Sequence, residues 1–206
     1  MNGSALNGMT EPNTFYPKNN TSMRIKTKDL IEELVEKTKN HLNELNKLKS
    51  LSSENLNYRP GPDQWSILEC VEHLNRYGRF YLPEIESRIE QSKSLAEDEF
   101  KSGFLGNYFA NSMLPKVKLN TMKTFKEMNP IGSDLDESSI QTLIDQQHKT
   151  LDLLSKAGSV SMNKTKTSIS ISKWIKLKLG DTFRVVVYHN YRHMVQIKNI
   201  TKELSI

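Results

Sequence analysis

The chain has 206 residues, 36% of them apolar and 26% charged, with a formal net charge of +5; this fits one globular domain with a short appendage and excludes two full domains or a wholly disordered chain. No run of about eighteen apolar residues occurs and the polar N-terminus contains no signal-peptide core, so we expect a cytoplasmic protein that does not bind a membrane. The single cysteine, Cys70, excludes an internal disulfide and fits a reducing compartment.

Two stretches contribute much of the positive charge. The first contains Lys116, Lys118, Lys123 and Lys126, and the second contains Lys164, Lys166, Lys173, Lys176 and Lys178. Neither is dense, and their lysines are not interleaved with aromatic residues at stacking spacing, so we expect no nucleic-acid partner. The stretches are either a solvated surface or a positive rim that attracts an anionic ligand.

The chain begins with a segment, residues 1–24, that is rich in Asn, Thr, Ser and Pro and shows no hydrophobic periodicity. We expect a disordered or loosely docked tail there, followed by a single domain over residues 25–206. Apolar residues then recur at three- and four-residue spacing from Leu30 to Leu48, which predicts an amphipathic helix with Thr27 as its N-cap.

A rigid turn separates this helix from the next. The sequence Pro60-Gly61-Pro62 cannot continue a helix. Ser66 and Glu69 then form the pattern of a capping box, in which each side chain binds the backbone amide of the other residue. The second helix therefore begins at Ser66 and is expected to run to about Gln91.

The pattern weakens over residues 92–136, where residues 104–114 could form a short helix. A third helix is predicted over residues 138–156, with Ser138 and Gln141 as a second capping box and Gly158 as the C-cap.

Residues 168–177 suggest a short helical or extended element. The last helix is expected to open at Gly180-Asp181, with Asp181 as its N-cap, and to run through Ile200. Four substantial helices and no convincing alternating strand predict an all-α fold, a four-helix bundle with long connections after the second helix.

Two histidines of the last helix, His189 and His193, stand four residues apart, so both side chains leave one face and could reach the same metal ion. The spacing alone does not decide between a metal site and two buried histidines that only form hydrogen bonds within the core. Both histidines, however, lie beside the apolar stripe of their helix, and His73 lies similarly beside Val71 and Leu74 on the second helix. Three imidazoles near a core would leave buried ring nitrogens without hydrogen-bond partners, which is unfavourable. A bound metal ion would give these nitrogens a partner.

Two segments of the chain resemble the signatures of the DinB-like superfamily. These are Leu56-x-x-Arg59-Pro60-Gly61-Pro62-x-x-Trp65-Ser66-Ile67-x-Glu69-x-x-x-His73-Leu74 and Tyr188-His189-x-x-x-His193-x-x-Gln196-Ile197. The resemblance implies a helical bundle with one divalent metal ion, and His73, His189 and His193 fall on the family's ligand positions. Some members of the family are transferases that use low-molecular-weight thiols such as bacillithiol or glutathione, and many have no assigned reaction.

A three-histidine site leaves metal positions open for water or substrate, as in catalytic sites. Zinc or nickel suits nitrogen ligands. Such an ion can lower the pKa of a coordinated water or thiol, so the site predicts a metal-dependent enzyme with a small-molecule substrate. Thiol transfer, with a low-molecular-weight thiol as co-substrate, and hydrolysis both remain open, as does a non-catalytic, metal-stabilised binding or stress-response module.

No further catalytic group stands out. Glu69, Tyr77 and Asn190 are weak candidates, because each lies near a proposed ligand yet has an adequate structural role. Cys70 could face the ion or be a buried structural residue. His41 and His148 are expected to be structural. Dimerisation through helix faces is also an open option.

Overall fold

The computed structural model describes residues 23–115 and 124–206. The predicted tail lies outside these residues except for Met23 and Arg24, and Lys116, Lys118 and Lys123 of the first basic stretch also lie outside them.

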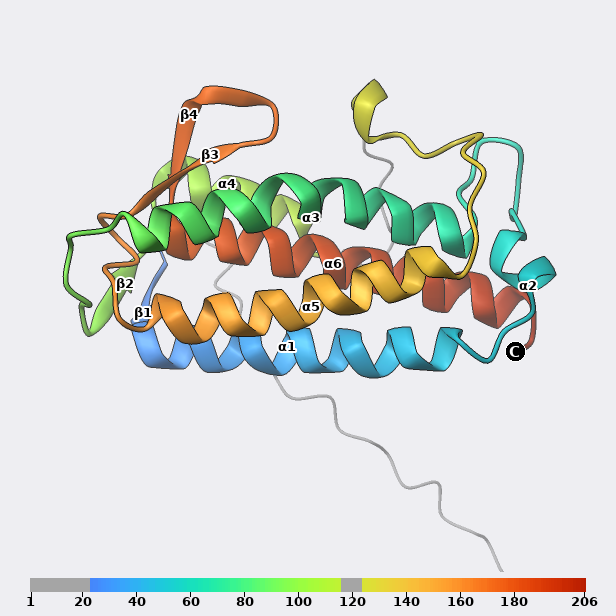
Figure 1. Ribbon diagram of the computed structural model, residues 1–206, viewed down its shortest axis with the longest axis horizontal. Helices are drawn as coiled ribbons and strands as arrows, with labels where there is room; N and C mark the ends of the chain where they lie inside the picture. The colour runs from blue at the N-terminus through green and yellow to red at the C-terminus, as the bar shows by residue number, and fades with distance from the viewer. Residues whose placement is uncertain (1–22, 116–123) are drawn as a thin grey trace, which may run out of the picture.

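Four long helices run side by side and form the body of the molecule (Figure 1). They are α1 (Thr27–Leu48), α3 (Ile67–Glu90), α5 (Ser138–Ala157) and α6 (Leu179–Glu203). Helix α3 packs against α5 and α6, and α1 packs against the same two helices. Consecutive long helices α1 and α3 therefore lie diagonally across the bundle. The predicted four-helix bundle is confirmed, with a topology that differs from a simple up-and-down order.

The described parts of the connections contain three shorter helices: α2 (Ser53–Asn57), α4 (Phe104–Met113) and the 3-10 helix η1 (Lys126–Met128). Helix α4 agrees with the short helix expected over residues 104–114, and it packs against α6. None of the helices in the described part of the chain has the length and hydrophobicity needed to cross a membrane.

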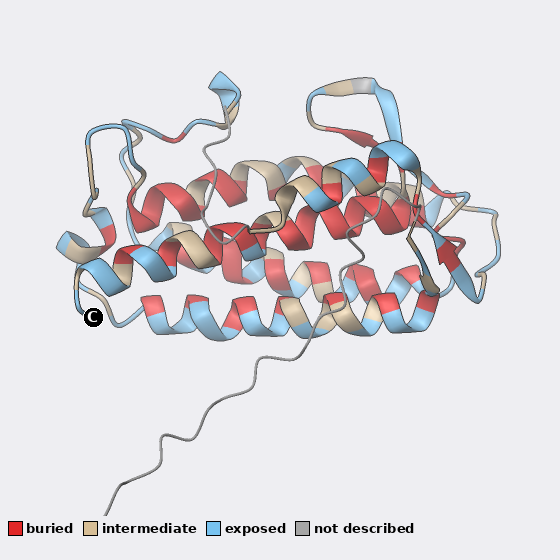
Figure 2. Ribbon diagram, turned by 180° about the vertical axis from the view of Figure 1, so that it is seen from behind, coloured by how far each residue is buried: buried red, intermediate tan, exposed pale blue. Residues whose placement is uncertain are grey.

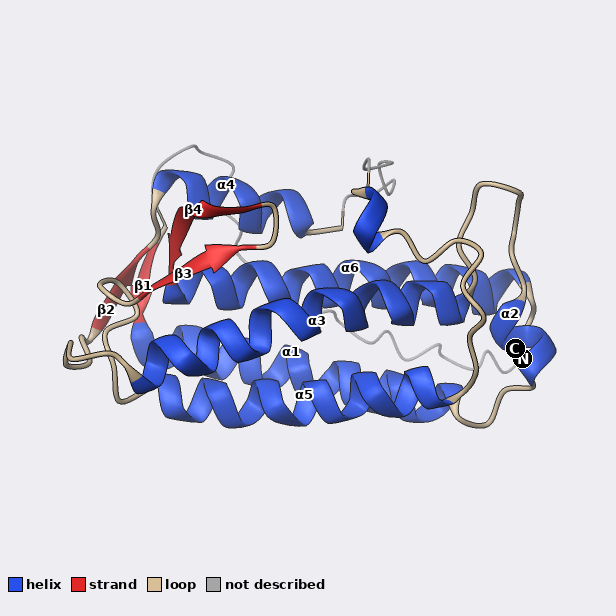
Figure 3. Ribbon diagram, turned by 45° about the horizontal axis from the view of Figure 1, so that its top comes forward, coloured by secondary structure: helices blue, strands red, loops and turns tan. Residues whose placement is uncertain are grey.

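Two small antiparallel ladders, which no alternating pattern in the sequence had indicated, flank one end of the bundle in the described part of the chain (Figure 3). Strand β1 (Arg24–Lys26) pairs with β2 (Glu99–Lys101), and β3 (Lys166–Ile169) pairs with β4 (Ser172–Lys178). The element expected over residues 168–177 is thus extended. Three of these four strands have only three or four residues, which is too few to show a clear alternation of apolar and polar side chains.

The capping box of α3 is confirmed. The Ser66 hydroxyl accepts a hydrogen bond from the Glu69 amide at 3.2 Å, and the Glu69 carboxylate accepts one from the Ser66 amide at 2.9 Å. The predicted C-cap of α5, Gly158, is also correct.

Two predicted N-caps, Thr27 and Asp181, are wrong, because their side chains bind other partners. Thr27 is the first residue of α1, and its hydroxyl donates to the Glu97 carbonyl at 2.6 Å. Asp181 lies inside α6, which begins at Leu179, and its carboxylate binds Ser102, Gly103 and Arg184.

The box predicted at the start of α5 does not form. The Ser138 amide donates to the Asp136 carboxylate at 2.9 Å, while Gln141 donates to Asp145 further along the helix.

The long helices carry buried residues along their length (Figure 2). The apolar ones among them form two clusters, one in each half of the bundle. On α6, for example, the first cluster includes Phe183 and the second includes Ile197. A polar layer separates them, and all four long helices contribute to it. Its buried or partly buried members are Thr38, His41, His73, Gln147, Thr150, His189, Asn190 and His193.

Candidate metal centre

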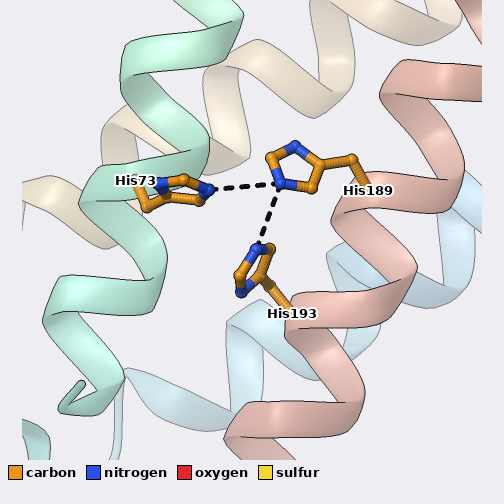
Figure 4. A group of neighbouring side chains, drawn as sticks. All are labelled: His73, His189 and His193. Atoms are coloured by element: carbon orange, nitrogen blue, oxygen red, sulfur yellow. Dashed lines mark hydrogen bonds between the residues drawn. The ribbon is translucent and has the colours of Figure 1, made fainter. Parts of the chain in front are cut away.

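The three histidines predicted from the sequence meet in this polar layer (Figure 4). His73 projects from α3, and His189 and His193 project from α6 one turn apart. One nitrogen from each ring can be chosen so that all three atoms lie within 4.8 Å of one another. The fold therefore brings together residues that are far apart in the sequence.

The ring nitrogens have the spacing of ligands around a small ion. The His189 Nε2 atom lies 3.2 Å from His73 Nε2 and 3.1 Å from His193 Nε2. Tetrahedral ligands at the usual zinc–nitrogen distance of about 2.0–2.1 Å are separated by about 3.3 Å. Both distances from His189 therefore suit ligands of a single divalent ion, and all three rings offer a nitrogen within 4.8 Å of the others.

Two of the outer ring nitrogens are held by the protein. The His73 Nδ1–H donates to the Met128 carbonyl at 2.7 Å, and the His193 Nδ1–H donates to the Gln196 side-chain oxygen at 3.0 Å. A ring that donates from Nδ1 keeps a lone pair on Nε2 in its neutral form. These partners therefore aim the Nε2 lone pairs of both rings at the centre of the cluster.

Burial keeps the three imidazoles neutral near pH 7. Loss of solvation lowers the pKa of His73 from 6.5 to about 4. Burial also lowers the pKa values of His189 and His193 well below 6.5, and repulsion from neighbouring imidazolium charge lowers them further. Metal ions bind the neutral form of histidine, so this environment favours coordination.

Two aromatic rings pack against the histidines. The Trp65 ring centroid lies 4.5 Å from that of His73 and 5.8 Å from that of His193. The Tyr77 centroid lies 5.0 Å from that of His73 and 4.8 Å from that of His189. These contacts restrict the imidazole orientations. Burial raises the pKa of Tyr77 to about 12, so its hydroxyl stays protonated at neutral pH.

The other candidate residues lie outside the ligand cluster. Both Glu69 oxygens are engaged, one by the Ser66 amide and Arg59 Nε and the other by Arg59 Nη2. Cys70 is fully buried within the second apolar cluster, and burial raises the pKa of its thiol. In the described part of the chain, no Asp, Glu or Cys joins the three histidines as a fourth ligand.

The remaining histidines do not reach the centre. His41 is buried on α1 and stacks on Tyr191, and His148 is exposed on α5. Neither belongs to the ligand cluster.

A cavity of about 300 Å³ opens beside the histidines, and His189, Tyr77 and Asn190 form part of its wall. The remaining wall comes from α3, α4, α5, α6, the β3–β4 hairpin and Phe125. The side-chain amide of Asn190 donates to the Gln147 oxygen at 3.2 Å, which fixes its orientation at the cavity.

Sequence reasoning missed several of these features. Trp65 and Gln196 belong to the two motifs, but their roles become visible only in the structure. Trp65 packs against His73, and Gln196 accepts a hydrogen bond from His193. Gln196 could have been found, because position i+3 on a helix lies next to His193. The Met128 carbonyl had no such signal, because any residue type supplies a backbone oxygen.

Comparison with known proteins agrees with this fold. No curated protein matches the chain. Its structure is similar to that of YfiT from Bacillus subtilis, with a TM-score of 0.53 and 11% sequence identity, over 85% of this chain and 87% of that one. YfiT is described as a probable metal-dependent hydrolase with an unusual four-helix bundle topology. The family model of the DinB superfamily matches residues 34–197, a range that includes all three histidines, and the chain therefore belongs to the DinB superfamily.

Proposed function

We propose that the protein is a metal-dependent enzyme that holds one divalent ion between His73, His189 and His193 and acts on a small molecule bound in the adjacent cavity. The observation that carries this proposal is the convergence of three imidazoles, in which His189 Nε2 lies 3.2 Å from His73 Nε2 and 3.1 Å from His193 Nε2. Zinc and nickel both suit three nitrogen ligands. The ion would lower the pKa of a coordinated water or thiol and so supply a nucleophile near neutral pH.

The side chains around the cluster would prepare the site for this chemistry. Met128 and Gln196 hold the outer nitrogens of two ligands, which keeps the rings oriented without a bound substrate. Trp65 shields one side of the cluster from solvent. The protonated Tyr77 hydroxyl can donate a hydrogen bond to a substrate in the cavity that it lines.

Thiol transfer is the reaction that we favour, with an external low-molecular-weight thiol as co-substrate. The protein's own thiol is unsuited to this task, because Cys70 is packed among apolar side chains and burial raises its pKa. A thiol from solution that lost its proton at the site would need no protein carboxylate as base. This agrees with the lack of Asp or Glu in the cluster among the described residues.

Hydrolysis is the second candidate. It is favoured by the description of the structurally similar Bacillus subtilis protein as a probable metal-dependent hydrolase. The same open metal positions would serve water in place of a thiol.

Metal analysis of protein purified without a histidine tag tests the site itself. We expect about one zinc or nickel ion per chain. The His189→Ala variant should lose it, and His148→Ala, which alters an exposed histidine on α5, should retain it. Unchanged metal content in His189→Ala would refute the proposed site.

An activity screen separates the two reactions. One arm combines glutathione or bacillithiol with an aromatic electrophile, and the other offers a panel of esters and amides without a thiol. Activity in the first arm that disappears in His189→Ala supports thiol transfer, and activity in the second supports hydrolysis. No activity in either arm, with metal bound, would refute the enzymatic function and leave a metal-stabilised binding module.

A further inference from the structure

The cavity beside the histidines is built almost entirely of uncharged side chains. Its wall is rich in aromatic rings, which come from Tyr77, Tyr81, Tyr108, Phe109 and Phe125. Aliphatic side chains from α3, α6 and the β3–β4 hairpin fill most of the space between them. No Lys, Arg, Asp or Glu is present among the described residues that line it.

This composition disfavours charged ligands. A charged group that enters an apolar cavity loses its hydration, and in the metal-free protein the described wall offers no opposite charge to compensate for that loss. An apolar or aromatic group gains instead, because its burial removes apolar surface from water. The cavity therefore distinguishes ligands by charge before any chemistry occurs.

The few polar groups on the wall are amides and hydroxyls with defined partners. Asn190 uses its amide nitrogen to bind the Gln147 oxygen, and Gln146 uses its amide nitrogen to bind the Asn75 carbonyl at 3.2 Å. Each amide nitrogen uses one of its two hydrogens in this way, and both side chains keep a carbonyl oxygen that can accept. A neutral ligand can therefore donate an N–H or O–H to these oxygens or accept a hydrogen bond from the Tyr77 hydroxyl.

The mouth of the cavity is apolar as well. Tyr108 of α4, Phe125 and Ile171 of the hairpin turn all line the cavity, yet their exposed fractions are 65%, 53% and 46%. Large apolar side chains that are exposed at a cavity entrance suit a ligand whose apolar body passes between them.

We propose that this cavity selects a neutral, largely apolar or aromatic small molecule, the electrophilic substrate of the reaction, and excludes carboxylated or otherwise anionic analogues. The assignment of that molecule as substrate rests on the proposed function, because the cavity adjoins the metal centre through His189. The charge preference is a property of the cavity wall and can be measured without metal or turnover.

A matched pair of fluorescent probes tests the preference. N-phenyl-1-naphthylamine and 8-anilino-1-naphthalenesulfonate share one ring system and differ by a sulfonate. We expect the neutral probe to bind at one site at least about tenfold more tightly than the sulfonate. Equal or tighter binding of the sulfonate would overturn the proposal.

Two pairs of variants locate the binding. Ser112→Trp places an indole in the cavity wall and should weaken binding of the neutral probe at least about tenfold, whereas Ser155→Trp makes the same change on an exposed position of α5. Ile171→Lys adds a positive charge at the mouth and should shift the preference toward the sulfonate. Its control, Ile175→Lys, alters a residue of the same hairpin that is not part of the wall.

Failure of this proposal is distinguishable from failure of the proposed function. Each probe titration is run on metal-loaded protein and on protein treated with EDTA. Bound metal with no preference for the neutral probe, or no effect of Ser112→Trp and Ile171→Lys, would overturn the cavity assignment alone. Tighter binding of the neutral probe than of the sulfonate, to a protein that takes up no metal, would support the charge preference and overturn the metal-dependent reaction.

Discussion

The Nε2 atom of His189 lies 3.2 Å from the Nε2 atom of His73, although 116 positions separate the two residues in the sequence. The contact exists because α3 and α6 are packed neighbours in the bundle. His189 also approaches His193, one turn further along α6, at 3.1 Å. Any change that reorients one of these rings should therefore alter metal affinity before it alters the fold.

Gln196 offers a direct test of this orientation. Its side-chain oxygen accepts the hydrogen bond from His193 Nδ1 at 3.0 Å. We expect Gln196→Ala to weaken metal binding by about tenfold to a hundredfold, because loss of such a partner frees the ring and its tautomer. Gln196→Glu should retain or strengthen affinity, since a carboxylate makes the imidazole a stronger ligand.

Competition with a chromogenic chelator would measure these affinities. Gln91→Ala, at the exposed C-cap of α3, serves as the matched control. Equal affinity in Gln196→Ala and Gln91→Ala would show that the contact has no role in metal binding.

The sequence predicted the long helices well because they depend on short-range patterns, and it named the three histidines that the fold brings together. The amphipathic stripes specify which face of each helix is buried, and the Ser66–Glu69 capping box needs only residues three apart. His189 and His193 share a helix face by spacing alone. His73 could be added because its own motif marks it, not because any local rule joins it to α6.

The errors arise where long-range contacts override local preferences. Asp181 has the residue type of an N-cap, but its carboxylate binds Ser102, 79 positions earlier in the chain. Thr27 similarly binds Glu97, 70 positions later. The cavity could not be predicted from the sequence for the same reason, because α4 and the β3–β4 hairpin meet the long helices only in the folded chain.

The buried Asp181–Arg184 pair should be important for stability. Arg184 Nη1 lies 3.1 Å from Asp181 Oδ1, and both side chains are almost fully buried. Asp181→Ala would leave the guanidinium buried without its counter-charge, and we expect a loss of about 3–5 kcal/mol in the free energy of unfolding. Urea denaturation measures this loss.

The matched control for this pair is Asp152→Ala, which removes an exposed partner of Lys156 on α5 and should leave stability nearly unchanged. Arg184 also donates to Asn107 and Asn111 of α4, so Asp181→Ala should speed amide hydrogen exchange in that helix. A small stability loss, similar to that of Asp152→Ala, would contradict the assignment.

Gly78 permits the close approach of Gln146 to α3. A Cβ atom at position 78 would lie 1.9 Å from the Gln146 side-chain oxygen, so Gly78→Ala must displace that side chain. Alanine favours the helix by about 1 kcal/mol, and loss of the Gln146–Asn75 hydrogen bond opposes it by about the same amount. We expect Gly78→Ala alone to change stability little.

In a Gln146→Ala background the obstacle is absent, so Gly78→Ala should stabilise the protein by about 1 kcal/mol. Urea denaturation of the wild type, both single variants and the double variant completes the cycle. Because Gln146 lines the cavity, Gly78→Ala should also change the affinity for the neutral probe. Additive stability effects would show that the two residues do not interact.

His41 should make stability depend on pH, independently of the metal centre. It is buried on α1, and neither ring nitrogen has a hydrogen-bond partner among the residues that the structure describes. Burial, with a smaller contribution from Lys37, lowers its pKa from 6.5 to about 4; Gln147 lies close enough to oppose this shift but not in hydrogen-bond geometry. The folded protein therefore holds His41 neutral where the unfolded chain would protonate it.

The sign of the effect follows from the two pKa values. As pH falls from about 6.5 to about 4, His41 binds a proton in the unfolded state but stays neutral in the folded state. The free energy of unfolding therefore decreases. His41→Leu removes this loss. Between pH 7.5 and pH 4.5, its stability relative to the wild type should rise by about 2–3 kcal/mol.

Urea denaturation at a series of pH values, with EDTA present to exclude metal linkage, measures this difference. His148→Leu, on the exposed face of α5, is the matched control and should follow the wild-type curve. His73, His189 and His193 titrate equally in all three proteins, so they cancel in the comparison. A His41→Leu curve parallel to that of the wild type would show that the buried imidazole carries no pH-dependent penalty.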